Sequence, residues 1–250
     1  MENTKNIFFG FIALRYFVIT GIAFFIFYLI FKKNFNQIKI QKVFPKLKDY
    51  YREIKYSLLT TIVFMGYAYL IFRTPFRNYT QIYSDISEHS TSYFVASIIL
   101  ALVIHDTYFY WTHRLMHHPK LFKWFHLVHH QSTNPTPFTS YSFHPLEAIV
   151  EGGVIVVITV IMPIHPYATI LFMTFMLLYN VYGHLGYEIF PNWVIRSKIG
   201  KWLNTSTYHN MHHKHFNGNY GLYFRFWDKL LYTIHPDYER TIKELKFPEK

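Results

Sequence analysis

Histidine is the residue type most able to do chemistry in this chain, because 16 histidines are present and most of them fall in three short clusters. Two clusters repeat the spacing H-x-x-H-H, in F-H-L-V-H-H and Y-H-N-M-H-H, and an earlier stretch, T-H-R-L-M-H-H, contains H-x-x-x-H. On a helix these spacings place the imidazoles along one face. A single histidine is more often a hydrogen-bonded structural residue, but repeated boxes of this kind indicate a metal site.

Nine imidazoles suit a pair of metal ions and overfill a site for one ion. They comprise the two H-x-x-H-H boxes, the H-x-x-x-H pair and a lone histidine after the last apolar segment: His113, His117, His126, His129, His130, His184, His209, His212 and His213. Imidazole binds zinc, copper, nickel and iron, so the spacing alone leaves the identity of the metal open. The chain has no cysteine, which excludes thiolate-bound zinc, iron–sulfur clusters and thiolate catalysis.

Residues next to the clusters have two possible roles. His118 adjoins His117 but points about 100° away around a helix, so we expect it to support the site rather than to bind metal. His144 precedes Glu147 and Glu151, which lie at helical spacing. These acids either favour the dipole of a helix N-terminus or hydrogen-bond to ligand imidazoles.

Histidines outside the boxes are expected to be bystanders. His89 and His165 fall on the opposite face, and His235 lies on the C-terminal tail, while His105 stays undecided. Asp106 shares a helical stripe with the first box but lies roughly 10 Å from it along the axis. It could therefore orient a histidine of another segment.

The histidine clusters are connected by apolar segments, of which the chain has five. They are long for a soluble protein, and with about half of all residues hydrophobic they are typical of a membrane protein. Several are shorter than the roughly 20 residues that cross a bilayer, which favours tilted helices or a thin hairpin pair. The first lacks a small-residue cleavage site and is interpreted as an anchor. The segments are Ile7–Phe31, Tyr56–Phe72, Tyr93–Tyr110, Ile149–Ile164 and Tyr167–Gly183.

The basic residues are distributed unevenly between the segments. If 32–55, 105–144 and 184–250 lie on one side of a membrane, that side holds 21 of the 25 lysines and arginines. This asymmetry follows the positive-inside rule. The net charge of +11 therefore reflects topology, and nucleic-acid binding is not expected. Every histidine cluster then returns to the same cytoplasmic face, where one site can be assembled from all of them.

The character of the chain changes near residue 93, after a polar loop from Arg73 to Ser92. We predict an N-terminal membrane anchor region over 1–92, with two spans and a basic linker, and a catalytic domain over 93–250. A long helix from Tyr93 to about His118 should stop at Pro119. The predicted fold is all-α: an integral membrane helical bundle with a membrane-apposed helical cap that holds a histidine-rich di-metal site.

Two long stretches carry a family resemblance. H-R-L-M-H-H-P-K-L-F-K-W-F-H-L-V-H-H is followed by P-T-P-F-T-S-Y-S-F-H-P-L-E, and Y-H-N-M-H-H-K-H-F-N-G-N-Y-G stands ahead of F-W-D-K-L. These motifs closely resemble the sterol desaturase branch of the fatty acid hydroxylase superfamily, with a pattern nearest to lathosterol oxidase-type sterol desaturases. The likeness covers about residues 105–236, in order and with similar intervals.

The resemblance implies a non-haem di-iron centre that uses dioxygen and external electrons, with the nine histidines above as iron ligands. Glu188 stands where some members have a further histidine, so it is either a tenth ligand or an interfacial acid. Asn219 and Asp228 match the family pattern and would support the site, unless they only form a turn or cap a helix. His215 occupies a position that the family fills with other residues and is left out of the site.

Such a centre would explain the attack on an unactivated C–H bond, which no protein side chain can achieve. The predicted function is hydroxylation or desaturation of a lipid, sterol-like or fatty acyl, at a bacterial inner membrane or the endoplasmic reticulum. The sequence has no dinucleotide, haem-attachment or flavin motif, so electrons should come from a ferredoxin or cytochrome b5 type of partner. A carotenoid hydroxylase is an alternative, as is a metal transporter, although transport sites usually lie near mid-membrane.

Overall fold

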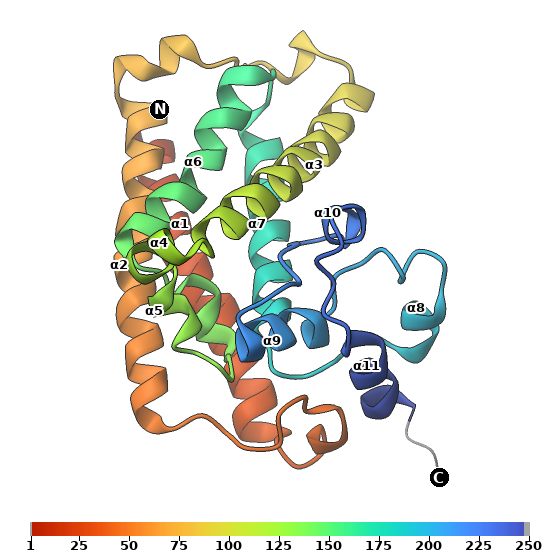
Figure 1. Ribbon diagram of the computed structural model, residues 1–250. Helices are drawn as coiled ribbons and strands as arrows, with labels where there is room; N and C mark the ends of the chain where they lie inside the picture. Colours follow the sequence, from red (N-terminus) through yellow and green to blue (C-terminus); the bar gives the residue numbers. More distant parts are fainter. Residues whose placement is uncertain (1, 248–250) are drawn as a thin grey trace.

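The computed structural model describes residues 2–247, and within them the regular structure is helical, with only three isolated β-bridges. Five long helices form the body of the molecule (Figure 1). The first of them continues as a π-helical turn over Phe25–Ile30. The long helices are α1 (Glu2–Phe24), α2 (Leu47–Arg73), α3 (Thr91–Met116), α6 (Pro145–Ile161) and α7 (Pro166–Gly183). The all-α part of the predicted fold class is therefore confirmed.

Short helices lie beside and below the long ones, on the side away from the 74–90 loop (Figure 1). Two of them, α5 (Leu127–His130) and α9 (Ser206–His215), carry five of the nine predicted ligand histidines. Single turns of 3-10 helix occur at Asn36–Ile38, Pro75–Tyr79, Ile86–Glu88 and Pro137–Tyr141. The short α-helices are α4 (Pro119–Phe125), α5 (Leu127–His130), α8 (Asn192–Arg196), α9 (Ser206–His215), α10 (Phe226–Leu230) and α11 (Tyr238–Lys246).

Two helices are long and apolar enough to cross a membrane, namely α2 and α3. Only 28% and 22% of their most apolar stretches are buried inside the protein, whereas the core helix of a soluble protein would be mostly buried. The other three predicted spans also form helices, but α6 and α7 have 17 and 18 residues, and within the searched residues of the first the apolar stretch covers Leu14–Ile30. By length and composition, the described residues support two of the five predicted spans.

Helix boundaries follow local signals that the sequence contains. Three helices begin at a His-Pro pair, and in each the histidine Nδ1 accepts a hydrogen bond from the backbone N–H two residues later. Proline fits the first helical position, where its missing N–H costs nothing. These pairs begin α4, α6 and α7: His118-Pro119, His144-Pro145 and His165-Pro166.

One predicted boundary was wrong, because the basic linker expected over 32–55 becomes helical at Leu47, where α2 begins. After Pro119 the chain forms two separate helices, α4 and α5, because the backbone breaks at His126, with φ −121° and ψ −10°. This break changes the directions of the side chains that follow it.

The apolar core lies among α2, α3, α6 and α7, where Ile71, Ala101, Ile158 and Phe172 are fully buried. A second buried cluster, which includes Tyr16, Tyr141, Ala148 and Leu177, packs α1, α6 and α7 against the loop that follows α5. A hydrogen bond also fixes that loop to α1, since Tyr16 Oη donates to the Phe138 carbonyl at 2.7 Å. The histidine-bearing segments are thus attached to a rigid helical frame.

Candidate metal centre

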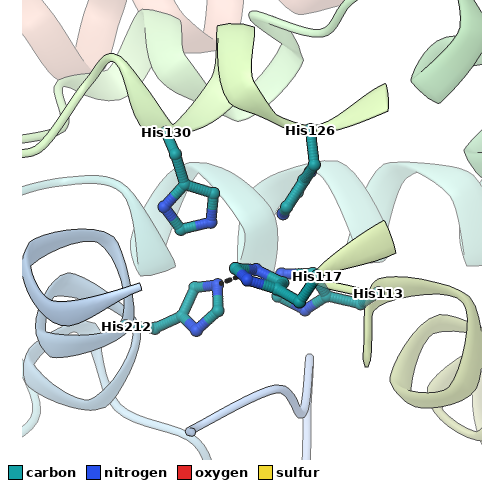
Figure 2. A group of neighbouring side chains, drawn as sticks. All are labelled: His113, His117, His126, His130 and His212. Carbon is teal, nitrogen blue, oxygen red and sulfur yellow. Dashed lines mark hydrogen bonds between the residues drawn. The ribbon is translucent and has the colours of Figure 1, made fainter. Parts of the chain in front are cut away.

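The nine predicted ligand histidines come together in two groups, in each of which the potential ligand atoms lie within 4.8 Å of one another. Eight of the nine side chains are buried, and His117 is half-buried. Figure 2 shows the larger group, with two imidazoles facing three others across a small space. The larger group is His113, His117, His126, His130 and His212, and the smaller group is His129, His184, His209 and His213.

Each H-x-x-H-H box contributes to both groups. In α5 the neighbouring residues His129 and His130 turn to different groups, and in α9 His212 and His213 do the same. Adjacent residues on a helix point about 100° apart, so one short helix can serve two sites. The last residues of α3 supply the larger group, and His184, directly after α7, supplies the smaller group.

Five of the imidazoles have Nδ1 hydrogen-bonded to an oxygen atom of the protein. In four of the five pairs the partner is a backbone carbonyl, which can only accept, so Nδ1 carries the proton and Nε2 keeps its lone pair. This is the tautomer that binds a metal through Nε2. The pairs are His113 with Tyr220 O (2.9 Å), His126 with Glu147 Oε1 (2.6 Å), His184 with Asn180 O (2.8 Å), His212 with Gly218 O (2.6 Å) and His213 with Ser132 O (3.0 Å).

The lone pairs in the smaller group point at one another. Nε2 of His184 lies 3.1 Å from Nε2 of His213, although both rings have their Nδ1 protons committed elsewhere. It also lies 3.0 Å from Nε2 of His209 and 3.2 Å from Nε2 of His129. Two lone pairs at this distance repel unless a cation lies between them. The donor set therefore fits a bound metal ion.

The larger group has the same character. Nε2 of His117 lies 3.1 Å from Nε2 of His212, the pair joined by a dashed line in Figure 2. Nε2 of His113 and Nε2 of His126 are buried without a hydrogen-bond partner among the described residues. Such buried polar atoms are costly unless something binds them. Nitrogen donors in both groups thus fit two metal ions.

Burial keeps these imidazoles in the neutral form that metals require. Desolvation, followed by the repulsion of neighbouring imidazoles, holds the pKa values of His129 and His213 well below the usual range. The same causes lower the pKa values of His130 and His209. Burial lowers the pKa of His184 to about 4. At neutral pH each of these imidazoles is therefore uncharged and keeps one nitrogen lone pair for a metal ion.

The loop after α9 supplies two of the carbonyls that hold imidazoles, and three predicted supporting residues fix this loop. Asp228 accepts hydrogen bonds from the backbone N–H of Tyr220 (3.0 Å) and Gly221 (2.7 Å). Asp106 accepts from the N–H of Tyr223 at 2.8 Å. Asn219 donates to Tyr208 O at 3.0 Å and accepts from the N–H of His235 at 2.7 Å. Each acts on the backbone rather than on an imidazole.

Glu147 is the one predicted supporting acid that touches a ligand ring, through His126. Glu188 lies outside both groups and binds the start of α9, where it accepts from the N–H and the hydroxyl of Thr207 at 2.9 and 2.8 Å. His118 and His144 cap α4 and α6. His215 and His235 stack on each other at 4.4 Å between ring centroids and belong to neither group.

The sequence interpretation missed Glu53. This fully buried residue of α2 accepts hydrogen bonds from the hydroxyls of Ser132 and Thr136. It therefore fixes the segment whose Ser132 carbonyl holds His213. An acid next to an apolar segment was a usable signal. The carbonyls of Ser132, Asn180, Gly218 and Tyr220 left no signal, because every residue has one.

An apolar cavity adjoins the two groups. Two of its lining residues pack against ligand rings. The ring centroids of Phe109 and His113 lie 4.9 Å apart, and those of Phe143 and His129 lie 5.1 Å apart. Asn180, also in the wall, holds His184. The remaining lining residues come from α2, α3, α6, α7, the 3-10 turn Pro137–Tyr141 and the loop between α9 and α10: Phe64, Tyr67, His105, Tyr141, Glu151, Gly152, Val154, Ile155, Phe172, Met173, Met176 and Leu222.

The fold and the site define an all-helical protein with a buried double cluster of histidines beside an apolar cavity. The sequence model of the fatty acid hydroxylase family matches residues 98–233, more than half of the chain. The chain belongs to this family. All nine histidines lie within the matched segment, so the resemblance to this superfamily is confirmed.

Curated relatives are sterol-modifying enzymes by name. The chain is 30% identical to a Delta(7)-sterol 5(6)-desaturase of Gibberella zeae, over 69% of this chain and 49% of the relative. It is 29% identical to human lathosterol oxidase, over 72% of this chain and 59% of the relative. It is 35% identical to methylsterol monooxygenase 1 of Danio rerio, over 52% of this chain and 44% of the relative.

The chain spans about half the length of the curated relatives that it matches. No solved structure gives a significant match.

Proposed function

We propose that this chain is a membrane-bound, non-haem di-iron oxidoreductase that uses dioxygen to hydroxylate or desaturate a lipid, sterol-like or fatty acyl. The observation that carries the proposal is the division of nine imidazoles into groups of five and four, with lone pairs directed inward. Family membership supports it, as do relatives named as desaturases, an oxidase and a monooxygenase.

In this proposal the larger group holds one iron and the smaller group holds the other. An iron pair supplies the capacity to reduce dioxygen and so to oxidise an aliphatic C–H bond. The protein contributes positioning: carbonyls and Glu147 hold the rings, and buried walls exclude water. Electrons come from an external donor of the ferredoxin or cytochrome b5 type.

Substrate access is proposed through the apolar cavity. A lipid fits its aromatic and methionine walls because burial of apolar surface drives binding, at roughly 25 cal/mol per Å². Phe109, Phe143 and Asn180 line the cavity and also contact histidines of the proposed metal centre. A carbon atom at this end of the cavity would be the one that is oxidised.

The membrane part of the proposal rests on α2 and α3. Val95, Ile99 and Val103 repeat every four residues along α3 and are each about half exposed, which suits contact with lipid tails. We propose a multi-pass protein with a membrane anchor region over 1–92 and a catalytic domain over 93–250. The excess of lysine and arginine in 32–55 and 184–250 supports a cytoplasmic metal site, in a bacterial inner membrane or the endoplasmic reticulum.

The experiment compares total lipid extracts of cells with and without the gene by mass spectrometry. Loss of two hydrogen atoms from a lipid would identify a desaturase, and gain of one oxygen atom would identify a hydroxylase. The control is the same chain carrying His129→Ala and His212→Ala, which lacks one proposed ligand in each group. A lipid change that persists in this control, or no change with the intact chain, would contradict the proposal.

A further inference from the structure

We propose that Glu151 is the polar anchor of the lipid substrate, and that it selects a lipid carrying a hydroxyl group. The inference rests on the proposed function, because the cavity that Glu151 lines is the one we assign to the lipid. It goes further by naming the polar group that the substrate presents inside the protein. No part of the metal centre requires this residue.

Glu151 lies on α6 with 8% of its surface exposed. Its Oε1 is buried and has no hydrogen-bond partner among the described residues. A carboxyl oxygen left in this state costs free energy, on the order of 1–3 kcal/mol for a polar atom and more for a charged one. A residue that serves only packing would be apolar here. The free oxygen instead suits a ligand that donates a hydrogen bond.

Among the other polar groups in the cavity wall, the Tyr141 hydroxyl also lacks a hydrogen-bond partner among the described residues, whereas three others have one. The Tyr67 hydroxyl donates to Ile149 O at 2.7 Å, and the Asn180 amide donates to Ser140 O at 2.8 Å. Nδ1 of His105 lies 2.9 Å from the Tyr223 hydroxyl. Glu151 therefore offers a free carboxyl oxygen on a mostly apolar surface, and it is the one acid among the lining residues.

Glu151 lies on α6 one turn away from Glu147, the residue that contacts a ligand histidine of the metal centre. Oε1 of Glu147 is 2.6 Å from Nδ1 of His126. Residues four apart share one helix face, roughly 6 Å apart. A group bound to Glu151 is thus held at a short, fixed distance from the metal groups. An anchor at this place would determine which carbon atom of the lipid meets the centre.

The chemistry of the wall decides which polar group fits. The lining residues include no lysine or arginine, so a carboxylate or phosphate head group would be buried without a counter-charge, beside another acid. An alcohol donates its O–H to Glu151 without bringing a charge into the cavity. Close packing of the wall continues at Gly152, where a Cβ atom would lie 2.6 Å from the Tyr67 ring. Space near the anchor is therefore narrow.

The test measures equilibrium binding of labelled lipids to the purified, metal-loaded full chain without reductant, so that no turnover is needed. Two matched pairs are used: lathosterol and its methyl ether, and hexadecan-1-ol and its methyl ether. An ether keeps the shape but has no proton to donate. We expect at least one alcohol to bind about 10-fold more tightly than its ether, the effect of one buried hydrogen bond. Equal binding within both pairs would overturn the proposal.

Variants locate the effect. Glu151→Leu should abolish the preference for the alcohol, whereas Glu151→Gln, which keeps a carbonyl acceptor, should retain it within about 3-fold. Glu244→Leu, at an exposed acid of α11, controls for the loss of an acid elsewhere. A preference that survives Glu151→Leu would overturn the proposal. Binding selectivity without any oxidised product would contradict the proposed function alone, so the two failures are distinguishable.

Discussion

Oε1 of Glu147 lies 2.6 Å from Nδ1 of His126, and both side chains are almost completely buried. A carboxylate behind a ligand imidazole fixes its orientation and makes its other nitrogen a stronger donor. Because α6 packs against both α2 and α3, this one contact connects the metal groups to the frame of long helices. It also accounts for one of the two acids in the mostly apolar helix α6.

The first prediction concerns this contact. Glu147→Ala should lower metal affinity or activity by roughly 10- to 100-fold, whereas Glu147→Gln, which still accepts a hydrogen bond, should lose less. Metal content by elemental analysis and product formation are measured at matched folded yield. Equal metal content and activity in Glu147→Ala and the unmodified chain would show that the contact has no supporting role.

The second prediction concerns Gly218, whose carbonyl accepts from Nδ1 of His212 at 2.6 Å. Its φ is +70°, and a Cβ atom would lie 2.6 Å from Thr233 O. Gly218→Ala should therefore cost about 1–2 kcal/mol of backbone strain and displace the carbonyl. We expect weaker metal retention during dialysis against a chelator. Gly66→Ala, in open space on α2, is the matched control and should retain metal normally.

The third prediction separates ligands from bystanders. His129→Ala and His212→Ala should each abolish activity and lower metal content, because each removes a donor from a buried group. His215→Ala and His235→Ala should keep most of both, since their rings stack outside the groups. His215 follows His212 by three residues, so spacing alone would admit it to the site. Metal loss in His215→Ala, or normal turnover in His129→Ala, would refute the assignment.

The fourth prediction concerns Lys39, which lies far from the histidines along the chain. Its Nζ is buried among the rings of Phe44 (4.5 Å) and Tyr187 (5.1 Å) and has no hydrogen-bond partner within residues 2–247. Burial lowers the pKa of Lys39 to about 8. A lysine with a depressed pKa stabilises the fold when neutral, and this stability is lost as pH falls through that value.

Lys39→Met removes the charge and keeps an adaptable apolar chain. Below about pH 8 the variant should therefore unfold at a higher temperature than the unmodified chain, and the difference should shrink above that pH. Thermal unfolding in detergent across this pH range measures it. Lys42→Met, at an exposed neighbouring lysine, should show no such crossover. A constant difference at every pH would count against a buried, titrating Lys39.

The spacing of the histidines predicted that they would share helix faces, because side-chain direction on a helix follows sequence position. Nine residues chosen by spacing and resemblance are the nine that the fold brings together. Their division into groups could not be predicted, since it depends on the backbone break at His126 and on the angle between α5 and α9. The interior roles of Asp106 and Asp228 were also beyond reach, because their partners are backbone N–H groups that long-range folding supplies.

Iron content tests the central claim most directly. The purified full chain is loaded with ferrous iron under low-zinc conditions, because zinc stands later than iron in the affinity series and would compete. Iron bound per chain is then measured by titration, together with dioxygen consumption in the presence of a reductant and lipid. Two groups of imidazoles predict saturation at two irons per chain and lipid-dependent dioxygen uptake. Saturation at one iron, without dioxygen uptake, would contradict a di-iron oxidase.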